Sequence, residues 1–422
     1  MAIALADHIV VDAHLSTADR EVLLALKLEC ENYGSPAHNI GRGRRAVEKK
    51  LQSLDSVPTV MNSHDFEPVS SSQGKASLSS RLLRCYISVA QGIVRHNADV
   101  VMLTHLVLYF ATSVPSAVLL FYHFTWPHAI VHLLMQLWYM PAYNLLMHQH
   151  IHQRGLLQPA FGSFDELFPY VLGPLMGHTW NSYYFHHVKH HHVEGNGPRD
   201  LSSTLRYRRD SAAHFAHYFA AFFLGTWVRL PLYFARRRQW ANAARMFAWE
   251  TASMALIAAS VAARPRPAVF ALLLPCMLLR LGLMLGNWGQ HAFIDPDKPN
   301  SDFRSSLTLI DVTSGRHCFN DGYHTSHHLN SRLHWRQHPL SFMQQLDRYG
   351  QEHAIVLHNI DFLMIAIRLF MKDYEYLAKC MIPIGDQMKM NLQERMEYLR
   401  CRTRQFSEAE LQEHFSSTYR KR

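Results

Sequence analysis

Residues 184–192 read YFHHVKHHH, and five of these nine residues are histidine. Neutral imidazole is the commonest protein ligand for first-row metals and suits iron, copper and zinc. On an α-helix, His187 and His191 lie one turn apart on one face, with His192 beside them. A His-rich solvated turn or an adventitious metal tract would stand alone in the chain. The stretch therefore predicts a metal site if other segments supply further ligands at similar spacing.

Three further motifs supply nitrogen ligands, and each lies just beyond a long apolar segment. Their spacings are H-x3-H, N-x3-H and H-x2-HH, which place the members of each motif on one face of a helix. Nine histidines and one amide are about twice the number of ligands that one transition-metal ion takes, so the set predicts two metal ions. Neutral nitrogen suits iron, copper or zinc better than calcium or magnesium. The predicted ligands are His148, His152, His187, His191, His192, His291, His324, His327, His328 and Asn287.

Four apolar segments are candidates to cross a membrane, since a helical crossing needs roughly 20 residues. They form two hairpins, and each hairpin returns the chain to its starting side, so all four motifs lie on one face. The further apolar segment 214–235 is assigned to the membrane interface, because this keeps the three arginines that follow it on the cytosolic side. The four predicted crossings are 100–122, 126–147, 246–263 and 267–286.

The sequence thus predicts an all-α integral membrane protein, with about four transmembrane helices in two hairpins and a cytosolic helical cap that carries the histidine motifs. A cytosolic N-terminal arm and linker is expected at 1–98, a membrane and catalytic region at 99–339, and a cytosolic C-terminal helical region at 340–422. Within the two flanking regions, we expect a helix at 17–33 and an amphipathic cap helix at 353–371. No chemistry is expected in either flank.

The net charge of +9 arises from 42 Lys and Arg against 33 Asp and Glu. Basic residues flank the apolar segments, most clearly at 236–238, which favours a cytosolic membrane face. Nucleic acid is not expected as a partner, because no basic stripe with interleaved aromatic residues is present. The six cysteines form no C-x-x-C pair, as is typical of reduced thiols. The acidic N-terminus lacks the profile of a signal or transit peptide, which favours the endoplasmic reticulum over a plastid.

In their order, with apolar hairpins between them, the four motifs resemble the membrane-bound fatty acid desaturase family over residues 100–339. The stearoyl-CoA desaturases of that family have an Asn/His element at the place of Asn287 and His291. The resemblance implies two iron ions, with Asn287 acting through a water molecule, and dioxygen as co-substrate. It implies a tunnel for a fatty acyl-CoA or acyl-lipid substrate and electrons from a carrier such as cytochrome b5 or ferredoxin. The H-P-G-G haem motif of fused relatives is missing from the sequence, where HPLS stands at 338–341, so the expected donor is a separate protein.

The resemblance therefore implies an oxygen-dependent oxidoreductase that introduces a double bond into a fatty acyl chain. A fatty acyl or lipid hydroxylase uses the same ligand set, and the sequence does not decide between these two outcomes. A His-rich membrane metal transporter is a third hypothesis, but transport ligands should lie at mid-membrane depth with carboxylates beside them. The histidines here lie at or beyond the ends of the apolar segments, which favours the enzyme.

Two registers are open in the YFHHVKHHH stretch. In one, the ligands are His187, His191 and His192; in the other, they are His187, His190 and His191. The first is favoured because the loop sequence VEGNGP follows His192 directly, and His186 and His190 are then flanking residues.

The second ring nitrogen of a metal-bound histidine usually donates to a carboxylate or a carbonyl. Judged by proximity in the sequence, the candidate carboxylates are Asp295, Asp311 and Asp321. His150 points away from the H-x3-H pair on its helix and is expected to lie outside the ligand set.

Overall fold

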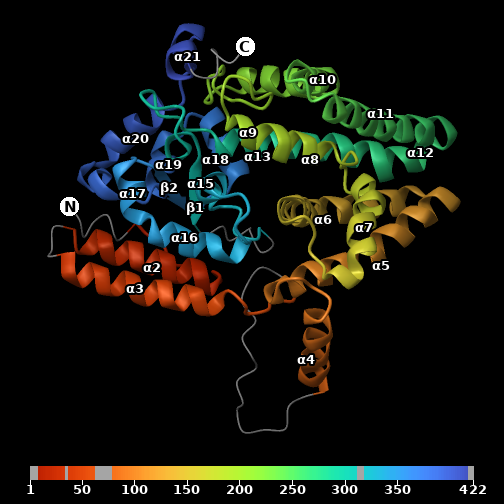
Figure 1. Ribbon diagram of the computed structural model, residues 1–422, viewed down its shortest axis with the longest axis horizontal. Helices are drawn as coiled ribbons and strands as arrows, with labels where there is room; N and C mark the ends of the chain where they lie inside the picture. The colour runs from red at the N-terminus through yellow and green to blue at the C-terminus, as the bar shows by residue number, and fades with distance from the viewer. Residues whose placement is uncertain (1–7, 34–36, 62–77, 311–317, 417–422) are drawn as a thin grey trace.

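A computed structural model describes residues 8–33, 37–61, 78–310 and 318–416, and most of these residues are helical. Long apolar helices gather on one side of the molecule, and the N-terminal and C-terminal helices form a second group beside them (Figure 1). The prediction of a mostly helical protein with long apolar helices is confirmed. The cytosolic position of the second group stays a prediction.

The first predicted hairpin consists of α5 (Val100–Tyr122) and α6 (Trp126–Gln153), which pack against each other. Helix α6 continues past the apolar segment expected from the sequence. His148 and His152 therefore lie in its last turns, one turn apart on one helical face, as expected.

Polar side chains join the two helices of this hairpin. The hydroxyl oxygen of Ser116 lies 2.9 Å from both His128 Nε2 and His132 Nδ1. Ser113 donates to the side-chain oxygen of Gln136 at 3.2 Å. Buried polar groups without partners are costly in apolar surroundings. The hydrogen bonds to Ser113 and Ser116 therefore explain how α6 can carry polar side chains in an apolar segment.

The second predicted hairpin has its turn at Arg264, as expected. The buried Glu250 and the partly buried Arg280 form an ion pair between its two arms. Because an unpaired charge at this depth would be strongly unfavourable, the pair fixes how the arms face each other. The arms are α11 (Trp240–Ala263) and a continuous run of α12 (Pro265–Ala268), the π-helix η4 (Val269–Leu273) and α13 (Leu274–Gln290).

Among the described residues, three helical stretches are long and apolar enough to cross a membrane, namely Asn97–Tyr122, Trp240–Ala263 and Pro265–Gln290. They match three of the four predicted crossings. Helix α6 is 28 residues long but less apolar, since it carries the polar side chains described above. It nevertheless exposes large apolar side chains such as Val131, Leu134 and Trp138, which is typical of a lipid-facing surface. The fourth crossing stays a prediction.

The segment expected in the membrane interface forms one helix, α10 (Ala212–Arg236), which packs along α11. It exposes Leu224 and Val228. Its depth in the membrane stays a prediction.

The N-terminal arm packs onto the C-terminal helices. Helix α2 (Thr17–Glu31) confirms the predicted first helix, with Ser16 as its N-cap, and pairs with α3 (Ala37–Leu54). Val22 and Leu26 of α2 lie in the same hydrophobic core as Phe342 and Tyr349. The arm is therefore part of the second helical group seen in Figure 1.

A small parallel sheet departs from the all-α expectation. Strand β1 (Leu307–Ile310) pairs with β2 (Ile355–His358), and every residue of both strands is buried. The expected single helix at 353–371 is wrong, because β-branched and apolar residues buried on both faces favour a strand here. Asn359, with φ of 53°, then turns the chain, and the Asp361 side chain caps α18 (Phe362–Phe370).

The other described elements are short or lie at the ends of the two groups. They are α4 (Leu78–Gln91), η1 (Asn97–Asp99), η2 (Pro159–Phe161), α7 (Gly162–Leu175), α14 (Asp302–Ser305), α15 (His324–Leu329), η5 (Trp335–Gln337), α16 (His338–Gln344), α17 (Leu346–Gln351), α19 (Tyr374–Cys380), η6 (Gly385–Lys389), α20 (Leu392–Cys401) and α21 (Glu408–His414).

Candidate metal centre

The structure brings all nine predicted histidines together, in two adjacent groups. Within each group, one nitrogen from every ring lies within 4.8 Å of the others. The groups border each other, since the ring centroids of His192 and His328 are 5.0 Å apart. The first cluster is His148, His152, His187, His192 and His327; the second cluster is His191, His291, His324 and His328.

A π-helical turn divides the YFHHVKHHH stretch between the clusters. The π-turn is η3 (His187–His191), and it stands between two short α-helices, α8 (Ser182–His186) and α9 (His192–Glu194). A π-turn contains one more residue than an α-turn, so His187 and His192 face the same way, with their Nε2 atoms 3.1 Å apart. His187 and His191 stack one turn apart, with ring centroids 5.5 Å apart, as the sequence predicts. They nevertheless belong to different clusters, His187 to the first and His191 to the second.

The first cluster is assembled from α6, the π-turn and α15. His327 Nε2 lies 3.0 Å from His148 Nε2 and 2.9 Å from His192 Nε2. His152 Nε2 is buried and has no hydrogen-bond partner. An orphaned imidazole nitrogen at the centre of such a group is the environment that a bound metal ion would satisfy.

The second cluster gathers around the end of α13. His291 follows this helix directly, and its Nε2 lies 3.4 Å from His324 Nε2. His324 and His328 lie one turn apart on α15, with their Nε2 atoms 3.1 Å apart. The H-x2-HH motif therefore supplies both clusters, since His327 lies in the first cluster and His324 and His328 lie in the second.

Two of the four rings in the second cluster have their outer nitrogens held by acceptors, whereas His324 Nδ1 is buried and has no hydrogen-bond partner. His191 Nδ1 donates to Asp200 Oδ2 at 2.6 Å, and His291 Nδ1 donates to the carbonyl oxygen of Ser305 at 2.7 Å. With the proton on Nδ1, each Nε2 turns an unshared electron pair inward. Lone pairs that converge on one point repel each other unless a cation lies between them. The residues present therefore fit a first-row transition metal.

Burial lowers the pKa of several of the clustered rings. It lowers the pKa of His291 to about 3, with the neighbouring His191 adding to the effect. Burial and neighbouring rings also hold the pKa values of His192 and His327 well below the ordinary value. Burial acts to raise the pKa of Asp200, but the charge and hydrogen bond of His191, together with His190 and His186, bring it below the ordinary value, so this carboxylate stays ionised. Neutral imidazole beside an ionised carboxylate is the form in which histidine binds metals.

The predicted supporting carboxylates have different outcomes. Asp321 Oδ1 lies 3.4 Å from His148 Nδ1, as expected. The prediction for Asp295 is wrong, because its carboxylate pairs with Arg402 at 2.7 Å and Arg304 at 3.3 Å. Asp311 lies outside the described residues. Sequence reasoning missed Asp200, although it stands in the loop that follows the histidine stretch.

The flanking histidines lie outside both clusters. His190 Nε2 accepts the backbone N–H of Leu201 at 2.9 Å, and His150 Nε2 lies 2.9 Å from the carbonyl oxygen of Asp165. His186 packs against Phe222, with ring centroids 4.9 Å apart. This arrangement favours the register that was preferred from the sequence.

Asn287 lies one turn before His291 on α13. Its amide nitrogen donates to the carbonyl oxygen of Ser202 at 2.8 Å and to the hydroxyl of Tyr218 at 2.7 Å. The side chain lines the same cavity as the clusters. Its role through a water molecule stays a prediction.

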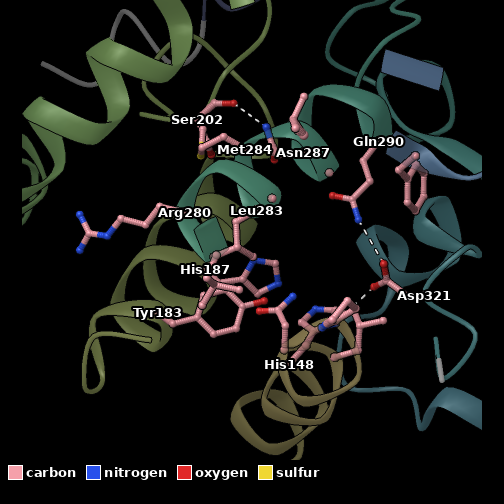
Figure 2. Close-up of a pocket in the computed structure, with 18 of the residues that line it drawn as sticks. His148, Tyr183, His187, Ser202, Arg280, Leu283, Met284, Asn287, Gln290 and Asp321 are labelled. Atoms are coloured by element: carbon pink, nitrogen blue, oxygen red, sulfur yellow. Dashed lines mark hydrogen bonds and ion pairs between the residues drawn. The ribbon is translucent and has the colours of Figure 1, made fainter. Parts of the chain in front are cut away.

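A cavity of about 360 Å³ opens onto both clusters. In Figure 2, His148 and His187 lie around one space, with Tyr183 beside them and the hydrogen-bonded pair of Gln290 and Asp321 to their right. The rest of the wall is mostly apolar and comes from α6 and α13. Its apolar members include Met140, Leu145, Leu279, Leu283 and Met284. The cavity can therefore hold an apolar chain against the candidate metal centre.

Comparison with known proteins agrees with this geometry. Residues 124–355, more than half of the chain, match the family model described as fatty acid desaturase. No match was found among curated proteins or among solved structures. The matched residues include every histidine of both clusters.

Proposed function

We propose, from the premise that this chain belongs to the fatty acid desaturase family, that it is a membrane-bound oxidoreductase that uses dioxygen to introduce a double bond into a fatty acyl chain. The observation that carries the proposal is the apolar cavity that ends on two adjacent histidine clusters. Polar walls would be expected for a soluble substrate. The mostly apolar wall here supports a long hydrocarbon chain as the part of the substrate that enters.

The two clusters would each hold one iron ion, the first through five histidines and the second through four. Bound iron would supply the oxidising power, drawn from dioxygen, that removal of hydrogen from an unactivated C–H bond requires. Iron is proposed on the family and on the neutral nitrogen ligands, which suit a transition metal.

The protein's own residues position the reactants. Asp200 and Ser305 hold the rings of His191 and His291 in one orientation, so no reorganisation is needed when a metal binds. The apolar side chains of α6 and α13 exclude water and align one methylene of the acyl chain with the clusters. Cavity geometry, rather than the ligand set, would decide between desaturation and hydroxylation.

Electrons are proposed to come from a separate carrier such as cytochrome b5 or ferredoxin. The substrate is proposed to be a fatty acyl-CoA or an acyl-lipid, and the histidine clusters to face the cytosol at the endoplasmic reticulum. Arg236, Arg237 and Arg238 at the end of α10 support a cytosolic face on this side. Glycosylation acceptors inserted at the turns at 123–125 and 264–266 should be modified in the lumen, whereas one inserted after Arg238 should not. The opposite pattern would invert the topology.

The activity is tested by the lipid profile of a host expressing the wild type or His327→Ala, using gas chromatography–mass spectrometry with double-bond localisation. The matched control is His217→Ala, an exposed histidine on α10. We expect a new unsaturated acyl species that is lost in His327→Ala and kept in His217→Ala. A hydroxylated species with the same dependence would establish the alternative, a fatty acyl or lipid hydroxylase. Identical products in wild type and His327→Ala would contradict both.

A further inference from the structure

Helix α18 carries an exposed apolar stripe. Leu363, Ile367 and Met371 follow one another at intervals of four residues, so they lie on one face of the helix. Their exposed fractions are 52%, 39% and 65%. Arg368 is the one charged residue of this helix. We call Leu363, Ile367 and Met371 the outer stripe. An exposed stripe of this kind marks a surface that contacts an apolar partner.

The opposite face of α18 packs on the end of α13. Ala366 is buried in one hydrophobic core with Trp288. A side-chain carbon placed on Gly289 would lie 2.5 Å from the carbonyl oxygen of Phe362, so the two backbones approach closely here and glycine is required. This contact fixes α18 beside the end of α13, where Figure 1 shows it between the two helical groups.

The end of α13 sets the depth of α18 relative to a membrane. The stretch Pro265–Gln290 is long and apolar enough to cross and contains 26 residues. At 1.5 Å per residue it is about 39 Å long, whereas the hydrocarbon core of a bilayer is about 30 Å thick. Centred on a bilayer, the stretch would extend about 5 Å beyond the core at each end. Trp288 and the helix packed on it would then lie at the level of the lipid headgroups.

The outer stripe continues into the cavity that opens onto the histidine clusters. Leu363 lines this cavity and is also exposed on the outer surface. Pro141 of α6 and Gly282 of α13 likewise line the cavity and are exposed. Phe362, which precedes Leu363, has its ring centroid 6.2 Å from that of His324 in the second cluster. The first turn of α18 therefore joins the outer surface to the candidate metal centre.

We propose that α18 lies in the membrane interface with its outer stripe among the lipid tails, and that the acyl chain enters the cavity from the bilayer past Leu363. The inference rests on the proposed function and narrows its substrate to an acyl-lipid that resides in the membrane. Lys372 is exposed beside Met371, at the polar edge of the stripe, where a cation meets headgroup phosphates. Entry from the bilayer spares the apolar chain a passage through water.

Membrane contact is tested on the full-length protein in lipid nanodiscs. The exposed thiols are removed by Cys85→Ser and Cys401→Ser, and a fluorophore is attached through Ile367→Cys or Lys379→Cys. Lys379 is the matched control, because it is half-exposed on α19 and pairs with Glu375 there. Lipids with brominated acyl chains should quench the fluorophore at position 367 and not at position 379. No quenching at position 367, or equal quenching at both positions, would overturn the proposal. This readout depends on neither iron nor turnover.

The substrate class is tested in the host by a pulse of labelled fatty acid. The labelled unsaturated chain should appear in phospholipid before it appears in acyl-CoA. Ile367→Glu, which sets a charge into the stripe, should cause a several-fold loss of product with unchanged iron, whereas Lys379→Gln should match the wild type. Product that appears first in acyl-CoA, or full activity in Ile367→Glu, would overturn entry from the bilayer while the desaturase itself stands. A wild type without product would contradict the proposed function, and quenching at position 367 would still decide the membrane contact of α18.

Discussion

The Nε2 atoms of His187 and His192 lie 3.1 Å apart, although five positions separate the two residues. In an α-helix, residues five apart point about 140° away from each other. The π-turn η3 removes that divergence and at the same time turns His191 toward the second cluster. One local departure from α-helical geometry therefore lets a single nine-residue stretch supply ligands to two neighbouring sites.

This geometry predicts which histidines of the YFHHVKHHH stretch are needed to bind iron. His192→Gln should lower iron from about two ions to about one per chain and abolish the product, since it removes a first-cluster ligand. His190→Gln should keep both irons, because its side chain can still accept the Leu201 N–H that His190 Nε2 accepts now. Iron analysis together with the lipid profile checks both variants. Iron loss in His190→Gln with full iron in His192→Gln would restore the other register.

The histidines could be predicted from the sequence, but their division into two clusters could not. The i,i+4 pairs follow from helical periodicity alone, and His148 and His152 lie as expected. Periodicity places His187 and His191 on one face, where their rings stack, but it does not reveal that the two residues belong to different clusters. Asp200 and Ser305 were missed because loop folding, not spacing, brings them to the rings.

Asp200→Asn tests the outer contacts of the second cluster. The amide is a weaker acceptor than the carboxylate for the His191 Nδ1–H, so His191 becomes a poorer ligand. Loss of such a contact typically costs about 10–100-fold in metal affinity or activity. Iron release to a competing chelator should show this change, whereas Asp297→Asn, an exposed aspartate, should behave as the wild type. Equal iron affinity in the wild type and Asp200→Asn would contradict the role assigned to this carboxylate.

The stability of the metal-free protein should fall as the pH is lowered below about 6.5. The pKa of His291 is about 3 in the folded chain and near 6.5 when unfolded. Between these values the unfolded state binds a proton that the folded state does not, so acid favours unfolding. One such group contributes up to about 1.4 kcal/mol per pH unit. Melting temperatures of chelator-treated protein from pH 7.5 to 5 check this, and the slope should be shallower in His291→Gln. A melting temperature that does not change over this range would contradict it.

Narrowing the cavity should shorten the acyl chains that are accepted. Leu283 lines the cavity on α13, close to His187 in Figure 2, whereas Met277 on the same helix is exposed on the outer surface. Leu283→Trp should reduce the space for the substrate, and each methylene that no longer fits lowers kcat/KM roughly 10–200-fold. Product chain lengths should therefore shift to shorter species while iron content is unchanged. Met277→Trp, which adds the same bulk on the outer surface, should keep the wild-type profile. An unchanged chain-length distribution in Leu283→Trp would mean that the acyl chain runs elsewhere.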